Sequence, residues 1–472
     1  MSSLNSLVFN LAKIGNVFNN LDIPENLDLV RYSYMDYISK VMEYDRIYEY
    51  YCGESKALRE YKMITSRSNL KINTNFIKKF VKEETSYTVG NPVTYESTSD
   101  EEMQLIEKMK DIFYDWDENH DAHLMNYLNL FTRIYELYYI DADGNFSAKI
   151  IKPTEGYAYR DYNGETLFFV HFFDTEFEED VEVNGKIISA RPKYIDVYTK
   201  DFIYHFNDNF EEIRSKDNNK FKRVPVSVGV ISTEDYKDSL ARDIAGLQDA
   251  LETNLSDMGN EISDFRNAYM VLENCQFEKD EDLEEMKAKG ILEVGKDGKV
   301  EWLIKDINDT FVQNTIDRYI DLIYQIGCHI NHNEKLQSNL SGITLRSRLI
   351  SLENKCTTLI KSHKNILKNR IRFICEYLSM KKEGDFNYKR IKIIYTPNIP
   401  QDNLSTAQML SQVPDGVISN QTARTLFGFI TNPHQEGEQV KKEMEENQQF
   451  EDESLGELYG DKHQHTEANI EE

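Results

Sequence analysis

Cysteine is scarce in this chain of 472 residues, and its five cysteines form no Cys-x-x-Cys pair. An odd number of widely spaced thiols is typical of reduced cysteines in a cytoplasm and argues against a disulfide framework. No apolar run approaches the roughly 18 residues that a membrane-spanning helix needs. The N-terminus also lacks a charged region followed by a cleavage pattern. The sequence therefore predicts a chain that does not span a membrane and is not exported through a signal peptide.

The common motifs of nucleotide and hydrolytic chemistry are missing as well. There is no Gly-x-x-x-x-Gly-Lys-[Ser/Thr] loop, so ATP hydrolysis through a P-loop is not expected. Gly-x-Ser-x-Gly and His-Glu-x-x-His are also absent. His120 and His123, and separately His329 and His332, have spacings that could place two imidazoles on one helical face, but further ligands at a suitable spacing do not follow. We therefore predict no enzyme activity, no metal and no cofactor.

Positive charge is in the minority. The chain has 55 lysines and arginines against 82 acidic residues, which gives a net charge of −27. Such a chain repels phosphate, so tight binding of nucleic acid through a general basic surface is not expected. A well-solvated acidic surface is the simplest interpretation. The 40% of hydrophobic residues and the length are sufficient for two to four domains with a sizeable core.

Two long helical patterns flank one polar segment. In residues 308–330, apolar residues recur at three- and four-residue steps: Val312, Ile316, Tyr319, Ile323, Ile326 and Ile330. The same spacing continues from residue 345 to residue 380: Leu345, Leu349, Leu352, Cys356, Leu359, His363, Ile366, Arg370, Phe373 and Tyr377. Residues 331–344 between them are rich in Asn and Ser and contain Gly342. We predict a mobile loop that is held at both ends by helices.

A third long helix is predicted over residues 234–266, where Ser232 has the hydroxyl-x-x-acid spacing of a helix cap. One face is apolar: Leu240, Ile244, Leu247, Leu251, Leu255, Met258, Ile262 and Phe265. The other faces are acidic: Asp238, Asp243, Asp249, Glu252, Asp257, Glu261 and Asp264. The helix after the polar segment is basic instead: Arg346, Arg348, Lys355, Lys361, Lys364, Lys368, Arg370 and Arg372. We favour packing of this basic helix against the acidic one, in the same or a neighbouring subunit, over binding of DNA phosphates.

The rest of the chain alternates helical and strand patterns, so the predicted fold class is α+β and mainly helical. A helix is expected over residues 74–90, with Thr74 as N-cap and Gly90 as C′, and a strand should follow it. Three turn pairs then mark successive hairpins of one antiparallel sheet: Asp143-Gly144, Asn163-Gly164 and Asn184-Gly185. Residues 267–307 read as strand, short helix and a hairpin closed at Asp297-Gly298. The chain after Pro433 is acidic and poor in apolar residues, which predicts a frayed helix and disorder.

The order of these parts, from about Tyr48 to Pro433, resembles the portal proteins of tailed bacteriophages, especially the family from phages of Gram-positive hosts. The segment YYCGE (residues 50–54), followed by NTNFIKKFVKEETSYTVGNPVTY (residues 73–95), is similar to an N-terminal signature of that family. SGITLRSRLISLENK (residues 341–355) is similar to its Ser-Gly-x-x-Leu hinge after the stem, and Leu404–Phe427 resembles its crown.

The resemblance implies a ring of about twelve subunits at one capsid vertex, through which a separate ATPase pumps double-stranded DNA and from which the DNA is later ejected. The implied regions are an N-terminal arm (1–47), a wing (48–233), a stem helix (234–266), a clip (267–307), a second stem helix (308–330), a tunnel loop (331–344), a long wing helix with a closing strand (345–400), a crown (401–434) and an acidic, disordered tail (435–472).

The resemblance also assigns surfaces to partners. The tunnel loop would face DNA with Asn333, Lys335, Gln337, Ser338, Asn339, Ser341 and Gly342. The acidic stem would repel DNA with Asp249, Glu252, Asp257, Glu261 and Asp264. The clip would dock partners through Leu283, Glu284, Met286 and Lys287.

The implied partners are other copies of the chain, double-stranded DNA, the large terminase subunit, a head-tail adaptor, and the major capsid and scaffolding proteins, without a membrane. The implied location is the portal vertex of the virion, with the host cytoplasm during assembly. The alternative from another class is an intracellular helical scaffold or adaptor without a channel, for which the helical stripes alone would suffice.

Overall fold

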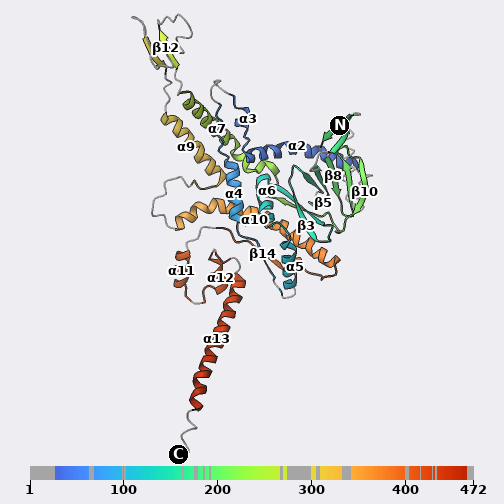
Figure 1. The fold of residues 1–472 in the computed structure, drawn as a ribbon, viewed down its shortest axis with the longest axis vertical. Helices are drawn as coiled ribbons and strands as arrows, with labels where there is room; N and C mark the ends of the chain where they lie inside the picture. Colours follow the sequence, from blue (N-terminus) through green and yellow to red (C-terminus); the bar gives the residue numbers. More distant parts are fainter. Residues whose placement is uncertain are drawn as a thin grey trace, which may run out of the picture.

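The computed structural model describes residues 27–62, 69–97, 99, 102–161, 163–174, 179–183, 186–190, 193–265, 269–273, 299–303, 309–331, 342–398, 403–414, 416–427, 429–430 and 433–464. The chain is elongated, with a central body of sheets and helices (Figure 1). On one side of the body, α7 (Leu240–Phe265) and α9 (Asp309–Gly327) extend outward and carry the paired strands β12 (Tyr269–Glu273) and β13 (Lys299–Leu303) at their far end. On the opposite side, α13 (Pro433–Gln464) extends away from the body.

The strands of the body form several small antiparallel sheets. A five-stranded sheet has the order β10-β9-β8-β5-β4, and a three-stranded sheet has the order β11-β2-β3. The strands of the first are β4 (Gly156–Arg160), β5 (Thr166–Asp174), β8 (Lys193–Tyr198), β9 (Phe202–Asn207) and β10 (Glu212–Asn218). Those of the second are β2 (Arg133–Ile140), β3 (Phe146–Ile151) and β11 (Val226–Val230). Two further pairs join β1 (Thr94–Ser97) to β14 (Ile391–Ile394), and β6 (Glu179–Val183) to β7 (Lys186–Ala190).

The three predicted hairpins are confirmed, but the prediction that they share one sheet is wrong. They connect β2 to β3, β4 to β5 and β6 to β7, which belong to three different sheets. Asp141 closes the first turn, because its carbonyl accepts from the N–H of Gly144 and its own N–H donates to Asn145. The sequence between the strands carries turn signals but no signal for which sheet a hairpin joins.

The helices of the body are α2 (Leu27–Cys52), α3 (Lys56–Glu60), α4 (Phe76–Val89), α5 (Met103–Tyr114), α6 (His120–Phe131) and α10 (Gly342–Met380). After β14 come α11 (Asn403–Gln412) and α12 (Asn420–Thr425), and two short 3-10 turns are η4 (Asp235–Asp238) and η5 (Tyr388–Arg390). None of the helices in these described ranges combines the length and the apolar content of a membrane span.

The apolar stripe predicted for α10 is confirmed from residue 352 onward. Its members are buried there: Leu352, Cys356, Leu359, His363, Ile366, Arg370, Phe373 and Tyr377. The stripes of α7 and α9 meet in a second core that also includes α2 and α4, with Ile244, Leu251 and Ile323 fully buried. Each fully buried aliphatic side chain stabilises the fold by about 1.5–3 kcal/mol, so these stripes hold the long helices to the body.

Several predicted helix ends are wrong, and each has a local cause. The cap of α4 is Asn75 instead of Thr74, because the Asn75 side chain accepts from the N–H of Lys78. Gly90 stays in the right-handed region, so it does not act as a left-handed C′ residue. The long helix predicted from residue 234 begins only at Leu240, because Ser239 accepts from the N–H of Arg242.

The two helices around the polar segment also differ from the prediction. The first ends at Gly327, three residues early, because Cys328 adopts a left-handed conformation (φ 63°) and the N–H of His329 bonds back to Tyr324. The second begins at Gly342, three residues earlier than predicted. A helix was expected after Pro433 together with disorder, and α13 continues as far as Gln464, since Glu, Gln and Lys are good helix formers.

Candidate functional site

One buried face of α7 is polar and binds the backbone of residues 70–77. Four side chains at four-residue steps form this face, here called the polar ladder: Gln248, Glu252, Ser256 and Asn260. They accept, in order, from the N–H groups of Ile77 (3.4 Å), Thr74 (2.9 Å), Ile72 (2.9 Å) and Leu70 (2.6 Å). Residues 70–75 lie outside any helix or strand, so these N–H groups need side-chain acceptors. The ladder therefore takes the place of a neighbouring strand.

Glu252 is the centre of the ladder. It is fully buried, and one carboxylate oxygen accepts from the N–H of Thr74 and from the amide of Gln248 (3.1 Å). The other oxygen accepts from the hydroxyl of Ser55. A carboxylate enclosed in this way does not face solvent, so the prediction that Glu252 presents charge to DNA is wrong.

The neighbouring acids of α7 also have partners inside the chain. Asp249 accepts from the hydroxyl of Tyr50 (2.8 Å) and the N–H of Ala57 (3.2 Å), and Asp257 accepts from the hydroxyl of Tyr61 (2.7 Å). Burial together with the Asp249 hydrogen bond raises the pKa of Tyr50. Glu261 is half-buried, and the side chain of Asp264 lies outside the described residues. A pore-lining role for these residues stays a prediction.

The two halves of the N-terminal signature contact each other beside the ladder. The Asn73 amide donates to the carbonyl of Gly53 (2.5 Å), and the Asn75 amide donates to the carbonyl of Tyr51 (3.2 Å). Gly53 has a left-handed φ of 89°, and a Cβ there would lie 2.3 Å from the Asn73 amide nitrogen. These residues therefore fix the end of α2 against the segment that the ladder binds.

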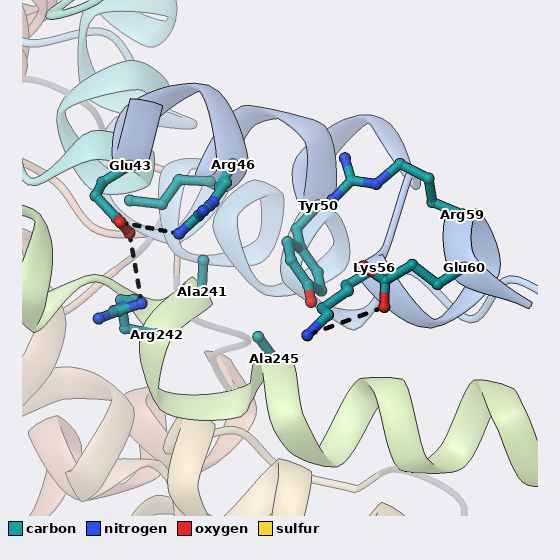
Figure 2. A pocket seen from close by; sticks show the side chains of 10 residues that line it. Glu43, Arg46, Tyr50, Lys56, Arg59, Glu60, Ala241, Arg242 and Ala245 are labelled. Carbon is teal, nitrogen blue, oxygen red and sulfur yellow. Dashed lines mark hydrogen bonds and ion pairs between the residues drawn. The ribbon is translucent and has the colours of Figure 1, made fainter. Parts of the chain in front are cut away.

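A cavity of about 430 Å³ opens between α2, α3 and the start of α7 (Figure 2). Its polar lining includes Arg46, Lys56, Arg59 and Arg242, together with Glu43 and Glu60. Glu43 pairs with Arg46 (2.9 Å) and Arg242 (3.5 Å), and Lys56 lies 4.0 Å from Glu60. Exposed pairs of this kind contribute about 0–1 kcal/mol each, so the cavity is a solvated junction between elements.

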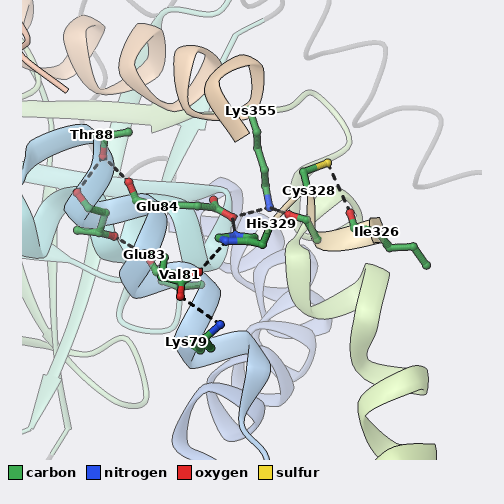
Figure 3. Close-up of polar contacts among 11 residues, drawn as sticks. Lys79, Val81, Glu83, Glu84, Thr88, Ile326, Cys328, His329 and Lys355 are labelled. Atoms are coloured by element: carbon green, nitrogen blue, oxygen red, sulfur yellow. Dashed lines mark hydrogen bonds and ion pairs between the residues drawn. The ribbon is translucent and has the colours of Figure 1, made fainter. Parts of the chain in front are cut away.

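A charged cluster lies where α9 ends and α10 passes, and we call it the hinge clamp: Glu83, Glu84, His329 and Lys355. Glu84 and His329 are buried, whereas Glu83 and Lys355 are half-buried. Figure 3 shows Glu84 of α4 between His329 and Lys355. One Glu84 oxygen lies 2.8 Å from His329 Nε2 and 2.7 Å from Lys355 Nζ, and His329 Nδ1 lies 2.8 Å from Glu83. The two helices that flank residues 331–344 are thus held by one carboxylate.

The surroundings of Glu84 favour its ionised form. Burial alone would raise the pKa of Glu84, but the hydrogen bond from His329 and the charge of Lys355 outweigh burial and hold that pKa below its ordinary value. The His329 ring stacks on Phe80 with centroids 3.9 Å apart. Lys355 Nζ also lies 3.3 Å from the carbonyl of Gly327, where a cation complements the C-terminal dipole of α9.

A second buried network joins α10 to α6 and β2. The guanidinium of Arg370 lies 2.6 Å from Glu136 and 2.7 Å from Asp121. His120 Nε2 lies 2.8 Å from Glu136, and the hydroxyl of Tyr138 donates to the Glu136 carboxylate at 2.7 Å. Burial would raise the pKa of Glu136, yet Arg370 and His120 lower it to about 2.

The histidine pairs noted in the sequence do not converge on a metal site. His120 contacts Glu136, whereas His123 lies 3.8 Å from Asp117. His329 is engaged in the hinge clamp, and His332 lies outside the described residues. Within the described ranges, no group of three His, Cys, Asp or Glu side chains could hold a metal ion.

Most of the surfaces assigned to partners cannot be placed. The tunnel-loop residues Asn333, Lys335, Gln337, Ser338, Asn339 and Ser341 lie outside the described residues, as do the clip residues Leu283, Glu284, Met286 and Lys287. Gly342 was predicted to lie in the loop but is the first residue of α10. At the first position of a helix, a residue with a restricted backbone such as proline is tolerated better than in a flexible loop. Within residues 267–307, β12 and β13 pair from Tyr269 with Leu303 to Glu273 with Lys299.

Within one chain, the main contacts of the basic helix are not with the acidic helix, and contact with the acidic helix of a neighbouring subunit stays a prediction. α10 packs against α4, α6, β2 and β11. Two of its cations pair elsewhere: the half-buried Lys355 with Glu84 of α4, and the buried Arg370 with the network on α6 and β2. No periodicity or motif in the sequence indicates that the acidic partners come from these separate elements.

We expect Glu252→Ala to lower the free energy of unfolding by about 2–3 kcal/mol, because it leaves the N–H of Thr74 and the hydroxyl of Ser55 buried without an acceptor. Urea unfolding followed by circular dichroism measures the change. Glu252→Gln keeps one acceptor, so its free energy of unfolding should lie between those of the wild type and the alanine variant. The control is Ser263→Ala, because Ser263 is exposed on the same helix. Equal stability of Glu252→Ala and Ser263→Ala would show that the ladder contributes little.

Comparison with known proteins gives the family. The model of the family described as "Phage portal protein, SPP1 Gp6-like" matches residues 34–449. The portal protein of Bacillus phage SPP1 is 21% identical over 420 residues, which cover 84% of this chain and 80% of that protein.

Two solved structures are also similar. The neck of an empty gene transfer agent particle has a TM-score of 0.43 at 10% identity, and the virion of a native gene transfer agent particle has a TM-score of 0.42 at 11% identity. Each match covers 74% of this chain and 88% of the other. The family match runs from α2 into α13 and takes in the polar ladder, the hinge clamp and both helices that project from the body, so the chain belongs to the SPP1 Gp6-like family of phage portal proteins.

Proposed function

We propose that this portal protein assembles into a closed ring at one capsid vertex and forms the channel for packaging and ejection of double-stranded DNA. In this proposal α7 and α9 are the stem, residues 267–307 the clip, residues 331–344 the tunnel loop and residues 401–434 the crown. The clip docks the large terminase subunit and the head-tail adaptor, and the protein is a conduit without catalysis of its own. It acts in the virion after assembly in the host cytoplasm with capsid and scaffolding proteins.

The observation that carries the proposal is the projecting helix pair. α7 and α9 pack along each other, from the core that they share with α2 and α4 to their far end, which projects from the body and carries the β12–β13 pair (Figure 1). Near that end a cavity of about 550 Å³ is lined by Met258, Ile262 and Val312, and Ile262 is 66% exposed. Apolar surface at the end of a projecting arm favours contact with another copy of the same arm.

Native mass measurement and negative-stain imaging test the proposal. We expect the full chain at micromolar concentration to form closed rings in both low and high salt. Ile262→Glu should reduce the yield of rings several-fold, because it places a charge at the proposed contact between stems. Tyr114→Glu on α5, where Tyr114 is 89% exposed, is the matched control and should assemble normally. A wild-type chain that stays monomeric or dimeric in both salts would refute the ring.

A further inference from the structure

The exposed side of α10 is free of acidic residues over more than five turns. Asp and Glu make up 82 of the 472 residues, yet none occurs from Asn354 to Arg372. Three lysines lie on the solvent side of this stretch, and we call them the lysine ridge: Lys361, Lys364 and Lys368. Lys361 and Lys368 are exposed, and Lys364 is half-buried.

Helical geometry aligns the ridge. The three positions are separated by three and four residues, so they share one face and span about 10 Å along the axis. The opposite face of α10 is fixed in the core by Leu359 and Ile366, which are both buried. The ridge is therefore a row of lysines on a helix whose backbone is held in place by the core.

The charges of the ridge are not compensated inside the chain. In the part of the chain that the structure describes, none of the three lysines forms an ion pair, whereas Lys355 and Arg370 on the same helix pair with buried carboxylates. Burial and the charges of Lys368 and Lys392 lower the pKa of Lys364. Like charges at this spacing destabilise a helix, so the ridge does not serve the stability of the fold.

The net charge of −27 does not prevent local attraction at the ridge. At physiological ionic strength the screening length is about 8 Å, so acidic side chains farther away contribute little to the field at the ridge. A row about 10 Å long matches roughly three phosphates of one DNA strand at 3.4 Å per phosphate. The exposed amides of Asn365 and Asn369 add neutral hydrogen-bond donors beside the row.

We propose that the lysine ridge binds the phosphate backbone of double-stranded DNA, without reading its sequence. This inference rests on the proposed function as a DNA channel. The net charge argues against tight binding of nucleic acid through a general basic surface. The proposed binding is local, of modest strength and strongly dependent on salt, so it is compatible with that argument.

Fluorescence anisotropy with a labelled duplex of about 25 base pairs tests the ridge across about 50–200 mM NaCl. If each lysine contacts one phosphate, the ridge contributes about 2.7 to the slope of log affinity against log salt, or about a 40-fold loss of affinity across that range. We expect K361Q/K364Q/K368Q to lose this contribution and K361R/K364R/K368R to keep it. The matched control is K200Q/K220Q/K222Q, which removes the same charge from exposed lysines elsewhere in the body.

Ring yield is measured on every variant by native mass. An unchanged salt slope in the K361Q/K364Q/K368Q variant overturns the proposal, as does an equal loss in the matched control. Unchanged DNA binding with a loss of rings also overturns it, and would assign the ridge to an acidic segment such as α13 of a second copy. The wild-type chain could also show a salt slope that depends on the ridge and yet form no rings. That result would support DNA binding by the ridge and refute the proposed ring assembly.

Discussion

Replacing Arg370 with methionine should lower the free energy of unfolding by about 3–5 kcal/mol, the largest effect expected for a single substitution in this chain. Methionine retains an unbranched apolar side chain at this position but leaves Glu136 fully buried without its main cation. Chemical unfolding of the assembled protein measures the loss. Arg372→Met, two residues farther along and 37% exposed beside Glu376, is the matched control and should change stability by less than about 1 kcal/mol.

A second substitution separates charge from packing at this site. Glu136→Gln in the Arg370→Met background removes the uncompensated charge and should recover part of the lost stability. No recovery in the double variant would mean that packing of the guanidinium, and not its charge, carries the effect.

The pH dependence of stability is an independent check on the network. The pKa of Glu136 is lowered from 4.5 to about 2, so its contribution is present above pH 4.5 and is lost as the pH falls towards 2. That contribution is on the order of 3 kcal/mol. The wild-type chain should therefore lose more stability between pH 5 and pH 2 than Arg370→Met does. Parallel losses in both proteins would contradict the assignment.

We expect Glu84→Ala to have the second largest effect, a loss of about 3 kcal/mol, because His329 and Lys355 would both lose the buried carboxylate that they share. Its local consequence should be faster proteolysis within residues 331–344, since the helices on either side would no longer be held together. Unfolding curves and limited proteolysis with mass spectrometry measure the two effects.

The matched control for the hinge clamp is Glu83→Ala, the neighbouring residue on α4. Glu83 contacts the same histidine, but its side chain is 37% exposed, so water replaces part of the lost contact and we expect a loss below about 1 kcal/mol. Equal proteolysis of residues 331–344 in both variants would show that the clamp does not control this segment.

The sequence predicted the long elements well because their periodicity reflects burial. On α10, even Arg370 and His363 were placed on the apolar stripe by spacing alone, and both are buried. What spacing could not supply was the identity of their partners. Glu136 lies far away in sequence on a strand, and an acid within a strand pattern reads as solvated surface until its neighbour is known.

The polar ladder was missed for a similar reason. The four-residue steps from Gln248 to Asn260 are visible in the sequence, but only Glu252 among them is charged, and it falls within the predicted acidic face. Their partner is an irregular segment about 180 residues earlier, and irregular backbone has no period to detect. The left-handed Cys328 that ends α9 also had no signal, because cysteine has no preference for that conformation.

The polar ladder has a mechanical consequence. Residues 70–77 run antiparallel to α7, since Ile77 meets Gln248 at one end and Leu70 meets Asn260 at the other. The hydrogen bonds of the ladder lie across the helix axis, so a force that pulls α7 lengthwise past this segment loads all of them in shear at once. A force that peels the segment away loads them one after another. The ladder therefore resists tension along α7 more strongly than it resists sideways peeling of residues 70–77.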